Sequence, residues 1–252
     1  KEGDEVIVPP LTFISSITPL LYNNITPVFA DIDKETFCID PIDVEKKITK
    51  KTKGILAVHF AGNSCDMRKL LSISKKYSLH LIEDCAQAHD TEYNGKKVGS
   101  FGIASAFSFY STKHMTTGEG GIILSNNKNI IEKCKMLRNH GLEGRNKHKL
   151  LGFNYRMTDL QGAVGVVQIK KLDSFIPKIV QSDSKPSIGI YRTLKTDPPI
   201  VERITEVKEI ELNLLESVSQ KIKKTTKITR EKFTNEFGFE LERMNVLIFL
   251  DK

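Results

Sequence analysis

Residues 54–84 read GILAVHFAGNSCDMRKLLSISKKYSLHLIED, and this stretch decides the fold. It contains two apolar runs, Gly54–Phe60 and Leu79–Asp84, which predict buried strands. Between them, Met67–Tyr77 has the spacing of an amphipathic helix. The side chains that this helix would turn toward a sheet are Met67, Leu70, Leu71 and Ser74. A strand–helix–strand unit of this length predicts two parallel strands joined by a right-handed crossover.

The same alternation of strands and helices continues on both sides of this segment. Further strands are expected at Glu5–Val8, Pro27–Ile32, Ile103–Phe109 and Gly121–Ser125. Further helices are expected at Val44–Ile48, Asn129–Arg138 and Leu160–Phe175. The fold class is therefore α/β, with a mainly parallel sheet flanked by helices.

Length and composition set the outer limits of the interpretation. The chain has 252 residues, of which 39% are hydrophobic and 27% charged. This is enough apolar material for the core of one large domain, with or without a smaller piece, and it excludes a wholly disordered chain. No apolar run reaches the length of a membrane span, so no membrane partner is expected. The chain opens at Lys1 rather than Met, and we expect an N-terminal segment to be missing.

The net charge and the cysteines exclude two further classes of protein. The formal charge is +7, but the one dense basic run, Lys221–Lys227, has no aromatic residues among its lysines, so no nucleic-acid partner is expected. The four cysteines, Cys38, Cys65, Cys85 and Cys134, are widely spaced. They predict free thiols in a reducing cytoplasm, with neither a disulfide framework nor a zinc site or other metal site.

Ligands of an open parallel sheet bind beyond the carboxyl ends of its strands, so polar residues at those ends are the candidates for chemistry. Asp84 ends an apolar strand and is placed to meet a buried cation. Gln87 follows three residues later, and one helical turn would bring its amide to the same side. A helix N-cap is an equally good interpretation of Asp84.

A second candidate segment, residues 107–121, reads FSFYSTKHMTTGEGG. It predicts a strand that runs into a glycine-containing loop with Lys113 on it. A lysine beside a buried strand end can lose its proton through desolvation and act as an amine nucleophile in Schiff-base chemistry. The alternatives are an exposed loop lysine and a plain hairpin turn.

The third segment, residues 151–161, reads LGFNYRMTDLQ. Thr158 or Asp159 can cap the helix that follows. Asn154 and Arg156 are polar residues among apolar ones, and they are candidates for binding an anion.

In this order and spacing, the three segments resemble the DegT/StrS family of pyridoxal-phosphate (PLP) sugar-nucleotide aminotransferases. Other matching stretches are GDEVIVP at 3–9, LTF at 11–13, PVFADID at 27–33, VHFAG at 58–62 and RNHG at 138–141. The resemblance covers residues 1–175 and implies a PLP-binding large domain of fold type I, like that of aspartate aminotransferase, which lacks its N-terminal segment. Residues 176–252 are unmatched, and we expect a mostly helical or poorly ordered tail there.

The resemblance also assigns roles to the residues that contact the reacting part of the cofactor. It implies that Lys113 forms the Schiff base with PLP and transfers a proton during the reaction. It implies that Asp84 pairs with the pyridinium nitrogen and that Gln87 lies near the phenolic oxygen. The ring nitrogen stays protonated beside a carboxylate, and the ring can then accept electrons.

The remaining implied roles concern the phosphate and the face of the ring. Ser108 matches a hydroxyl that binds the cofactor phosphate, and Phe13 matches an aromatic ring that stacks on the pyridine. Asn154 matches a phosphate ligand that the neighbouring subunit contributes, which implies a homodimer with a shared active site.

The implied function is a cytoplasmic PLP-dependent aminotransferase acting on a nucleotide-linked keto-deoxysugar, with glutamate as the amino donor, in polysaccharide or antibiotic-sugar biosynthesis. Related dehydratases have a histidine in place of the Schiff-base lysine; Lys113 followed by His114 favours the aminotransferase. A catalytically inactive remnant that keeps only the scaffold is the alternative function. His59 and His89 are expected either to line the cofactor pocket or to be satisfied structural residues.

Overall fold

The computed structural model describes residues 1–175, 180–181, 190–194 and 200–204. The chain divides into two compact units, residues 1–201 and 202–252. The central sheet and the candidate site lie in the first unit. Most of the tail expected at 176–252 falls outside the described residues. Its described parts are the short strands β9 (Val180–Gln181), β10 (Ile190–Leu194) and β11 (Ile200–Ile204).

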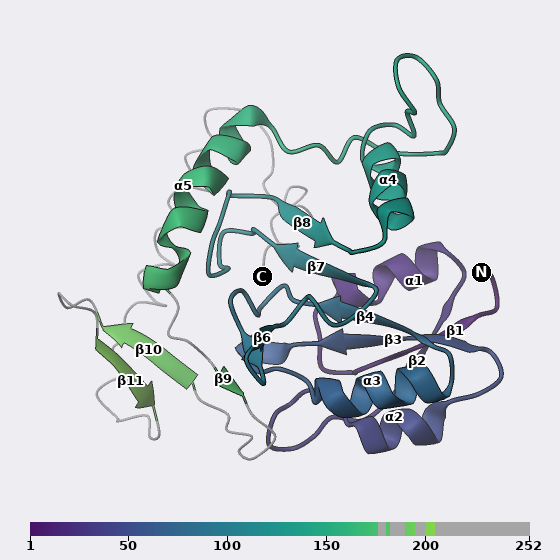
Figure 1. Ribbon diagram of the computed structural model, residues 1–252, viewed down its shortest axis with the longest axis vertical. Coiled ribbons are helices and arrows are strands. Elements are labelled where there is room, and N and C mark those ends of the chain that lie inside the picture. Colours follow the sequence, from purple (N-terminus) through teal and green to yellow (C-terminus); the bar gives the residue numbers. More distant parts are fainter. Residues whose placement is uncertain (176–179, 182–189, 195–199, 205–252) are drawn as a thin grey trace, which may run out of the picture. The chain divides into compact units, whose positions relative to one another are not determined.

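The first unit is built on a six-stranded sheet in the order β2-β1-β3-β4-β7-β8 (Figure 1). In chain order its strands are β1 (Glu5–Val8), β2 (Thr26–Phe29), β3 (Thr52–Val58), β4 (His80–Asp84), β7 (Ala104–Ser108) and β8 (Gly121–Leu124). Neighbouring strands are parallel except for β8, which is antiparallel to β7. The predicted α/β fold with a mainly parallel sheet is confirmed, and the predicted strands lie within about two residues of the observed ones except at the end of β2.

Helices connect most of the strands, and the four longest, α2, α3, α4 and α5, lie where the sequence predicts helices. They are η1 (Ile14–Ser16), α1 (Thr18–Tyr22), α2 (Pro41–Lys47), η2 (Phe60–Gly62), α3 (Met67–Lys76), α4 (Lys128–Leu137) and α5 (Asp159–Phe175). A small hairpin of β5 (Glu92–Tyr93) and β6 (Lys96–Lys97) pairs through β5 with β9. The sequence did not predict η1, α1 or this hairpin, because each is too short for a periodic pattern. No described helix is long and apolar enough to cross a membrane.

Alternate side chains of the strands pack on opposite faces of the sheet. On one face, residues such as Ile7, Ile55 and Leu81 form a core with helix α3 and with Val44 of α2. On the other face lies a smaller cluster around Val8 that includes Ile17, just before α1. Figure 1 shows α2 and α3 together along one face of the sheet and α1 on the opposite side. This separation matters for the site, because successive residues at the end of a strand face different layers.

The buried side of α3 differs from the prediction at two positions. Met67 and Leu70 are buried as predicted, but so is Ile73, which the prediction omitted, whereas Leu71 is 36% exposed. The prediction for Leu71 was wrong because a short helix in contact with one sheet buries a narrow stripe, here spaced by three residues. Asp66 caps the helix by accepting a hydrogen bond from the backbone N–H of Lys69 at 3.0 Å.

Helix α5 begins with the cap that the sequence predicted. The Thr158 hydroxyl accepts a hydrogen bond from the Gln161 backbone N–H at 3.3 Å, and Gln161 Oε1 accepts from the Thr158 N–H at 2.8 Å. This reciprocal pair is a capping box. It confirms Thr158, one of the two predicted residues, as the residue that caps α5.

Candidate active site

Asp84 lies at the carboxyl end of β4, and both of its carboxylate oxygens are engaged. Oδ1 accepts from the Ala86 backbone N–H at 3.0 Å, and Oδ2 accepts from the Ser16 hydroxyl at 2.7 Å. The Ser16 hydroxyl is also 2.6 Å from that of Thr12. Since Ser16 donates to Asp84, Thr12 donates to Ser16. Among the described residues no helix begins directly after β4, so the helix N-cap interpretation of Asp84 is wrong. Asp84 instead closes a local turn with Ala86 and makes a long-range bond that fixes its orientation.

Gln87 joins the turn after β4 to the turn after β3. Its Oε1 accepts from the Ala61 backbone N–H at 2.8 Å. Ala61 has a φ of +51°, a left-handed conformation that alanine rarely adopts. In the part of the chain that the structure describes, the amide nitrogen of Gln87 has no hydrogen-bond acceptor. Its donors are therefore available to a ligand.

Lys113 lies on the loop that joins β7 to β8. Backbone bonds from Phe109 N–H to the Gly120 carbonyl and from Thr117 N–H to the Phe109 carbonyl, each 2.9 Å, close this loop. Gly120 has a φ of +154°, and a Cβ there would lie 2.4 Å from Thr117 Oγ1, so the loop needs glycine at this position. Within the described residues, the half-exposed Lys113 side chain has no carboxylate partner. The amino group of Lys113 is therefore available to a ligand.

The loop that carries Lys113 starts at the same edge of the sheet as Asp84. Strands β4 and β7 are parallel neighbours, and Asp84 pairs in register with Ala106. Ser108 ends β7 two residues later, on the same face as Asp84 because side chains alternate. Its hydroxyl oxygen accepts from the Tyr110 backbone N–H at 3.2 Å. Phe13 follows β1, which β3 separates from β4 in the sheet, and it is 48% exposed.

His89 is buried beside this loop. Its ring centroid lies 5.6 Å from that of Phe107 and 5.6 Å from that of His114. Neither ring nitrogen has a hydrogen-bond partner in the described part of the chain. Burial, and then the positive charges of His114 and Lys113, lower the pKa of His89 to about 4. Burial, and then the positive charge of Lys113, lower the pKa of His114 as well.

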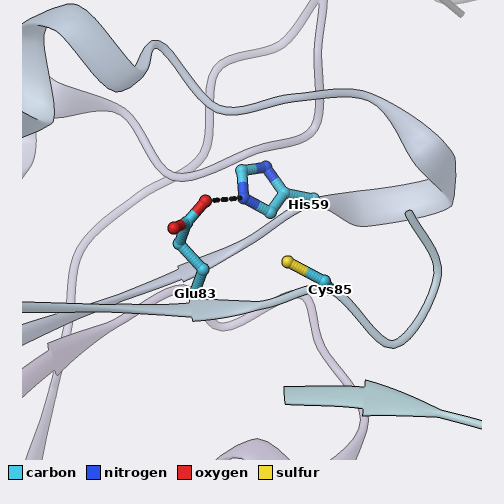
Figure 2. Close-up of side chains that lie close together, drawn as sticks. All are labelled: His59, Glu83 and Cys85. Atoms are coloured by element: carbon cyan, nitrogen blue, oxygen red, sulfur yellow. Dashed lines mark hydrogen bonds and ion pairs between the residues drawn. The ribbon is translucent and has the colours of Figure 1, made fainter. Parts of the chain in front are cut away.

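His59 has a structural environment. Its ring is fully buried, with Nε2 3.1 Å from Glu83 Oε2 (Figure 2). Nδ1 accepts from the Cys65 backbone N–H at 3.1 Å. Both ring nitrogens are therefore engaged within the protein, which favours the satisfied structural histidine of the two predicted alternatives.

Asn154 belongs to a different part of the described structure. It forms an isolated bridge with Asn139, next to the end of α4. Its Oδ1 is 3.5 Å from the Arg156 backbone N–H, and the Arg156 guanidinium donates to Asn139 Oδ1 at 2.6 Å. No hydrogen bond among the described residues joins Asn154 to Asp84 or to Lys113.

Sequence reasoning missed Ser16. The rule that pointed to Asp84 applies to it equally, because Ser16 follows the carboxyl end of β1, in the same parallel sheet. Ser16 is 8% exposed and lies 68 positions from Asp84 in the sequence. The pairing depends on the order of the strands, which the sequence does not state.

With this geometry established, comparison with known proteins identifies the family. Residues 1–229 match the profile of the DegT/DnrJ/EryC1/StrS aminotransferase family. The chain belongs to this family. The match of the DegT/DnrJ/EryC1/StrS family extends past residue 175, where the resemblance read from the motifs ended. Aminotransferases of the family use PLP.

Individual members of the family show which part of the chain is similar. GDP-perosamine synthase of Escherichia coli O157:H7 is 44% identical over 180 residues, covering 71% of this chain and 50% of that protein. The chain therefore spans about half the length of such relatives. Helicobacter pylori PseC, an aminotransferase involved in the biosynthesis of pseudoaminic acid, is 38% identical with a TM-score of 0.65, over 68% of this chain and 47% of that one. E. coli GDP-4-keto-6-deoxy-D-mannose-3-dehydratase with bound hydrated PLP is 30% identical with a TM-score of 0.66, over 69% and 50%.

Proposed function

We propose that these residues form the PLP site of an aminotransferase that acts on a nucleotide-linked keto-deoxysugar. The observation that supports it is the placement of Asp84, held by Ser16 and Ala86, at the sheet edge where the Lys113 loop begins. Two relatives, a GDP-perosamine synthase and a dehydratase of GDP-4-keto-6-deoxy-D-mannose, support the class of substrate by what their names say they act on or make. Because the chain spans half of such relatives, its activity is a proposal.

The donor set at this edge fits PLP. A carboxylate, an amino group and a hydroxyl lie on Asp84, Lys113 and Ser108, and the exposed ring of Phe13 follows strand β1 of the same sheet. Both ring nitrogens of buried His89, near Lys113, have no hydrogen-bond partner among the described residues. A polar ligand bound beside Lys113 could provide one. When bound, PLP supplies an electron sink for the carbon from which the amino group leaves.

Each side chain then has one task. Asp84, fixed in direction by Ser16, would hold a proton on the pyridine nitrogen. Lys113 Nζ would hold the cofactor and would carry the proton that the reacting carbon loses. The amide N–H groups of Gln87 would donate to the phenolic oxygen, and the Ser108 hydroxyl would bind the phosphate. Glutamate is the proposed amino donor.

The residues present at the proposed site bear on two alternative functions. In the dehydratase interpretation a histidine stands where Lys113 stands here, so the lysine favours amino transfer over dehydration. The inactive-remnant hypothesis has no support from the comparisons, and the lysine, carboxylate and amide of the proposed site are all present.

We also propose a homodimer in which Asn154 binds the cofactor phosphate of the neighbouring subunit. In support, the described partners of Asn154 lie beside α4 and not at the Asp84 edge. Large apolar side chains flank it in exposed positions: Leu151 is 85% exposed, Tyr155 72% and Leu160 81%. A second subunit covering this segment would remove that apolar surface from water.

Absorbance of the chain titrated with PLP tests the site. The wild type should gain a visible absorbance band that Lys113→Ala lacks, while Lys128→Ala, an exposed lysine at the start of α4, should keep it. Absence of a Lys113-dependent band would refute the proposed site. Transfer of ¹⁵N from labelled glutamate to a GDP-linked 4-keto-6-deoxysugar then tests the reaction.

Mixing two inactive variants tests the shared site. Lys113→Ala and Asn154→Ala chains, mixed and allowed to exchange subunits, should form a heterodimer with one intact site and regain PLP absorbance or transfer. Each variant mixed with itself is the control. No recovery in a mixture shown to contain heterodimers would refute the proposed role of Asn154 across the interface.

A further inference from the structure

Glu83, the residue before Asp84, is a fully buried carboxylate at the end of β4. It faces four hydrogen-bond donors. These are His59 Nε2 at 3.1 Å and the backbone N–H groups of Gly99 at 2.7 Å, Phe101 at 2.8 Å and Gly102 at 2.7 Å. Burial alone would raise the pKa of Glu83, but the bonds from His59 and the backbone outweigh it, so the pKa lies below its usual value. Glu83 is therefore an ion inside the protein.

Glu83 and the groups around it form a hydrogen-bonded network rather than a metal site. His59, Glu83 and Cys85 place ligand atoms within 4.8 Å of one another. Figure 2 shows the three side chains close together at the ends of their strands. Because His59 Nδ1 accepts from the Cys65 N–H, the ring proton lies on Nε2, toward Glu83. A metal on Nε2 would force a proton onto Nδ1, opposite the Cys65 N–H. Both oxygens of Glu83 are also already occupied by donors.

His59 contacts the end of β4 at two points. Its ring bonds the Glu83 side chain, and its backbone N–H donates to the Asp84 carbonyl at 3.0 Å. On the other side, the Cys85 N–H donates to the Ala106 carbonyl at 2.8 Å. Since successive side chains of a strand point to opposite faces, fixing Glu83 on the α3 face fixes the direction of Asp84 on the other.

The same network extends to Gln87. Ala61, whose N–H donates to Gln87 Oε1, lies two residues after His59 in the same turn. In that turn the Gly62 carbonyl accepts from the buried Thr91 hydroxyl at 2.9 Å. A displaced His59 would therefore move the group that holds the Gln87 amide.

We propose that Glu83 and His59 are positioning residues, a buried hydrogen-bonded pair that sets the direction of Asp84 and Gln87 from behind the sheet. The consequence for cofactor binding rests on the proposed function. The positioning itself does not, because two backbone N–H groups report it directly in the unliganded chain: Ala86, which donates to Asp84, and Ala61, which donates to Gln87.

The test compares four variants of the full chain. Glu83→Gln removes the charge and turns an N–H₂ group toward backbone donors. His59→Asn keeps an acceptor for the Cys65 N–H and loses the donor to Glu83, whereas His59→Gln keeps a donor to Glu83. Glu45→Gln, which loses a surface ion pair of 2.7 Å with Lys76, is the matched control.

Amide hydrogen exchange without PLP is the first measurement, with the Leu70 N–H in α3 as the reference for global opening. Glu83→Gln and His59→Asn should speed exchange at Ala61 and Ala86 at least tenfold relative to Leu70. His59→Gln and Glu45→Gln should change that ratio less than threefold. Wild-type ratios at Ala61 and Ala86 in Glu83→Gln would overturn the proposal, and so would faster exchange confined to Gly99, Phe101 and Gly102.

PLP binding is the second measurement. Glu83→Gln and His59→Asn should raise the Kd for PLP about tenfold and shift the pH midpoint of its absorbance, while His59→Gln and Glu45→Gln stay near wild type. Wild-type affinity and midpoint in a folded Glu83→Gln would overturn the consequence for the cofactor. If the wild type itself binds no PLP, the proposed function fails and the exchange measurement still decides the positioning.

Discussion

The Ser16 hydroxyl donates a 2.7 Å hydrogen bond to the carboxylate of Asp84, across 68 positions of sequence. It joins the turn after β1 to the end of β4, although β3 lies between these strands in the sheet. A carboxylate held in this way keeps one direction, which is the property that a partner for a ring nitrogen needs.

Replacing Ser16 by alanine should loosen Asp84. We expect a loss of about 1–3 kcal/mol in the free energy of unfolding, since a half-buried carboxylate loses a donor, and a five- to tenfold weaker affinity for PLP. Urea unfolding and PLP titration measure these effects. Ser15→Ala, one residue earlier and exposed, should leave both unchanged. Equal behaviour of the two variants would contradict the role given to Ser16.

His89 should make the unliganded chain less stable in mild acid. Its pKa lies near 4 in the folded protein, below the ordinary value of 6.5, so the folded state binds fewer protons than the unfolded state between these values. The free energy of unfolding should therefore fall with pH below about 6.5, by about 3 kcal/mol at pH 4 from this group.

Urea unfolding at pH 7, 6 and 5 measures this dependence. His89→Phe, which keeps an aromatic ring among Phe107 and Phe109, should lose less stability than the wild type as the pH falls. His80→Gln, at an exposed position in β4, should follow the wild type. Parallel curves for the wild type and His89→Phe would show that His89 does not titrate as described.

The four cysteines should differ sharply in reactivity. Cys38, Cys65 and Cys85 are buried, and Cys134 is half-exposed. Burial raises the pKa of Cys85. The hydrogen bond between Cys65 and Cys38, and then burial, raise the pKa of Cys65. Although that same hydrogen bond lowers the pKa of Cys38, its sulfur is out of reach of solvent.

A thiol-specific disulfide reagent added to the native chain should therefore label Cys134 first, and the others only after unfolding. Cys134→Ser should abolish the rapid phase. Rapid labelling that persists in this variant would show that the buried cysteines become exposed in the native state.

Two glycines should respond in opposite directions to alanine. Gly102 lies in the loop before β7, and a Cβ on it would lie 2.5 Å from the carbonyl oxygen of Leu81 in β4, while Gly162 in α5 has open space around it. Gly102→Ala should cost about 2–4 kcal/mol because backbone must move. Gly162→Ala should add about 0.5–1 kcal/mol through its better helix propensity. Thermal unfolding measures both, and a neutral Gly102→Ala would contradict the close approach of this loop to β4.

The elements of the fold were predictable because their signals are local. The apolar run at 54–60 predicts a strand, and the spacing of apolar residues from Met67 onward predicts a helix, each within a few residues. A polar residue at the end of such a strand marks a candidate site at the edge of the sheet. Asp84, Gln87 and Lys113 could be chosen from the sequence for this reason. Short pieces such as η1 could not, because one turn carries no periodicity.

What the sequence by itself determined is the α/β class, the parallel strands, the family motifs and the residue types that could do PLP chemistry. Only the tertiary structure decided their partners: Ser16 for Asp84, Ala61 for Gln87, and Glu83 for His59. The physical reason is that these bonds form between turns that are distant in the chain and meet at one end of the sheet. Which turns meet depends on strand order and register, and those are set by packing over the whole core.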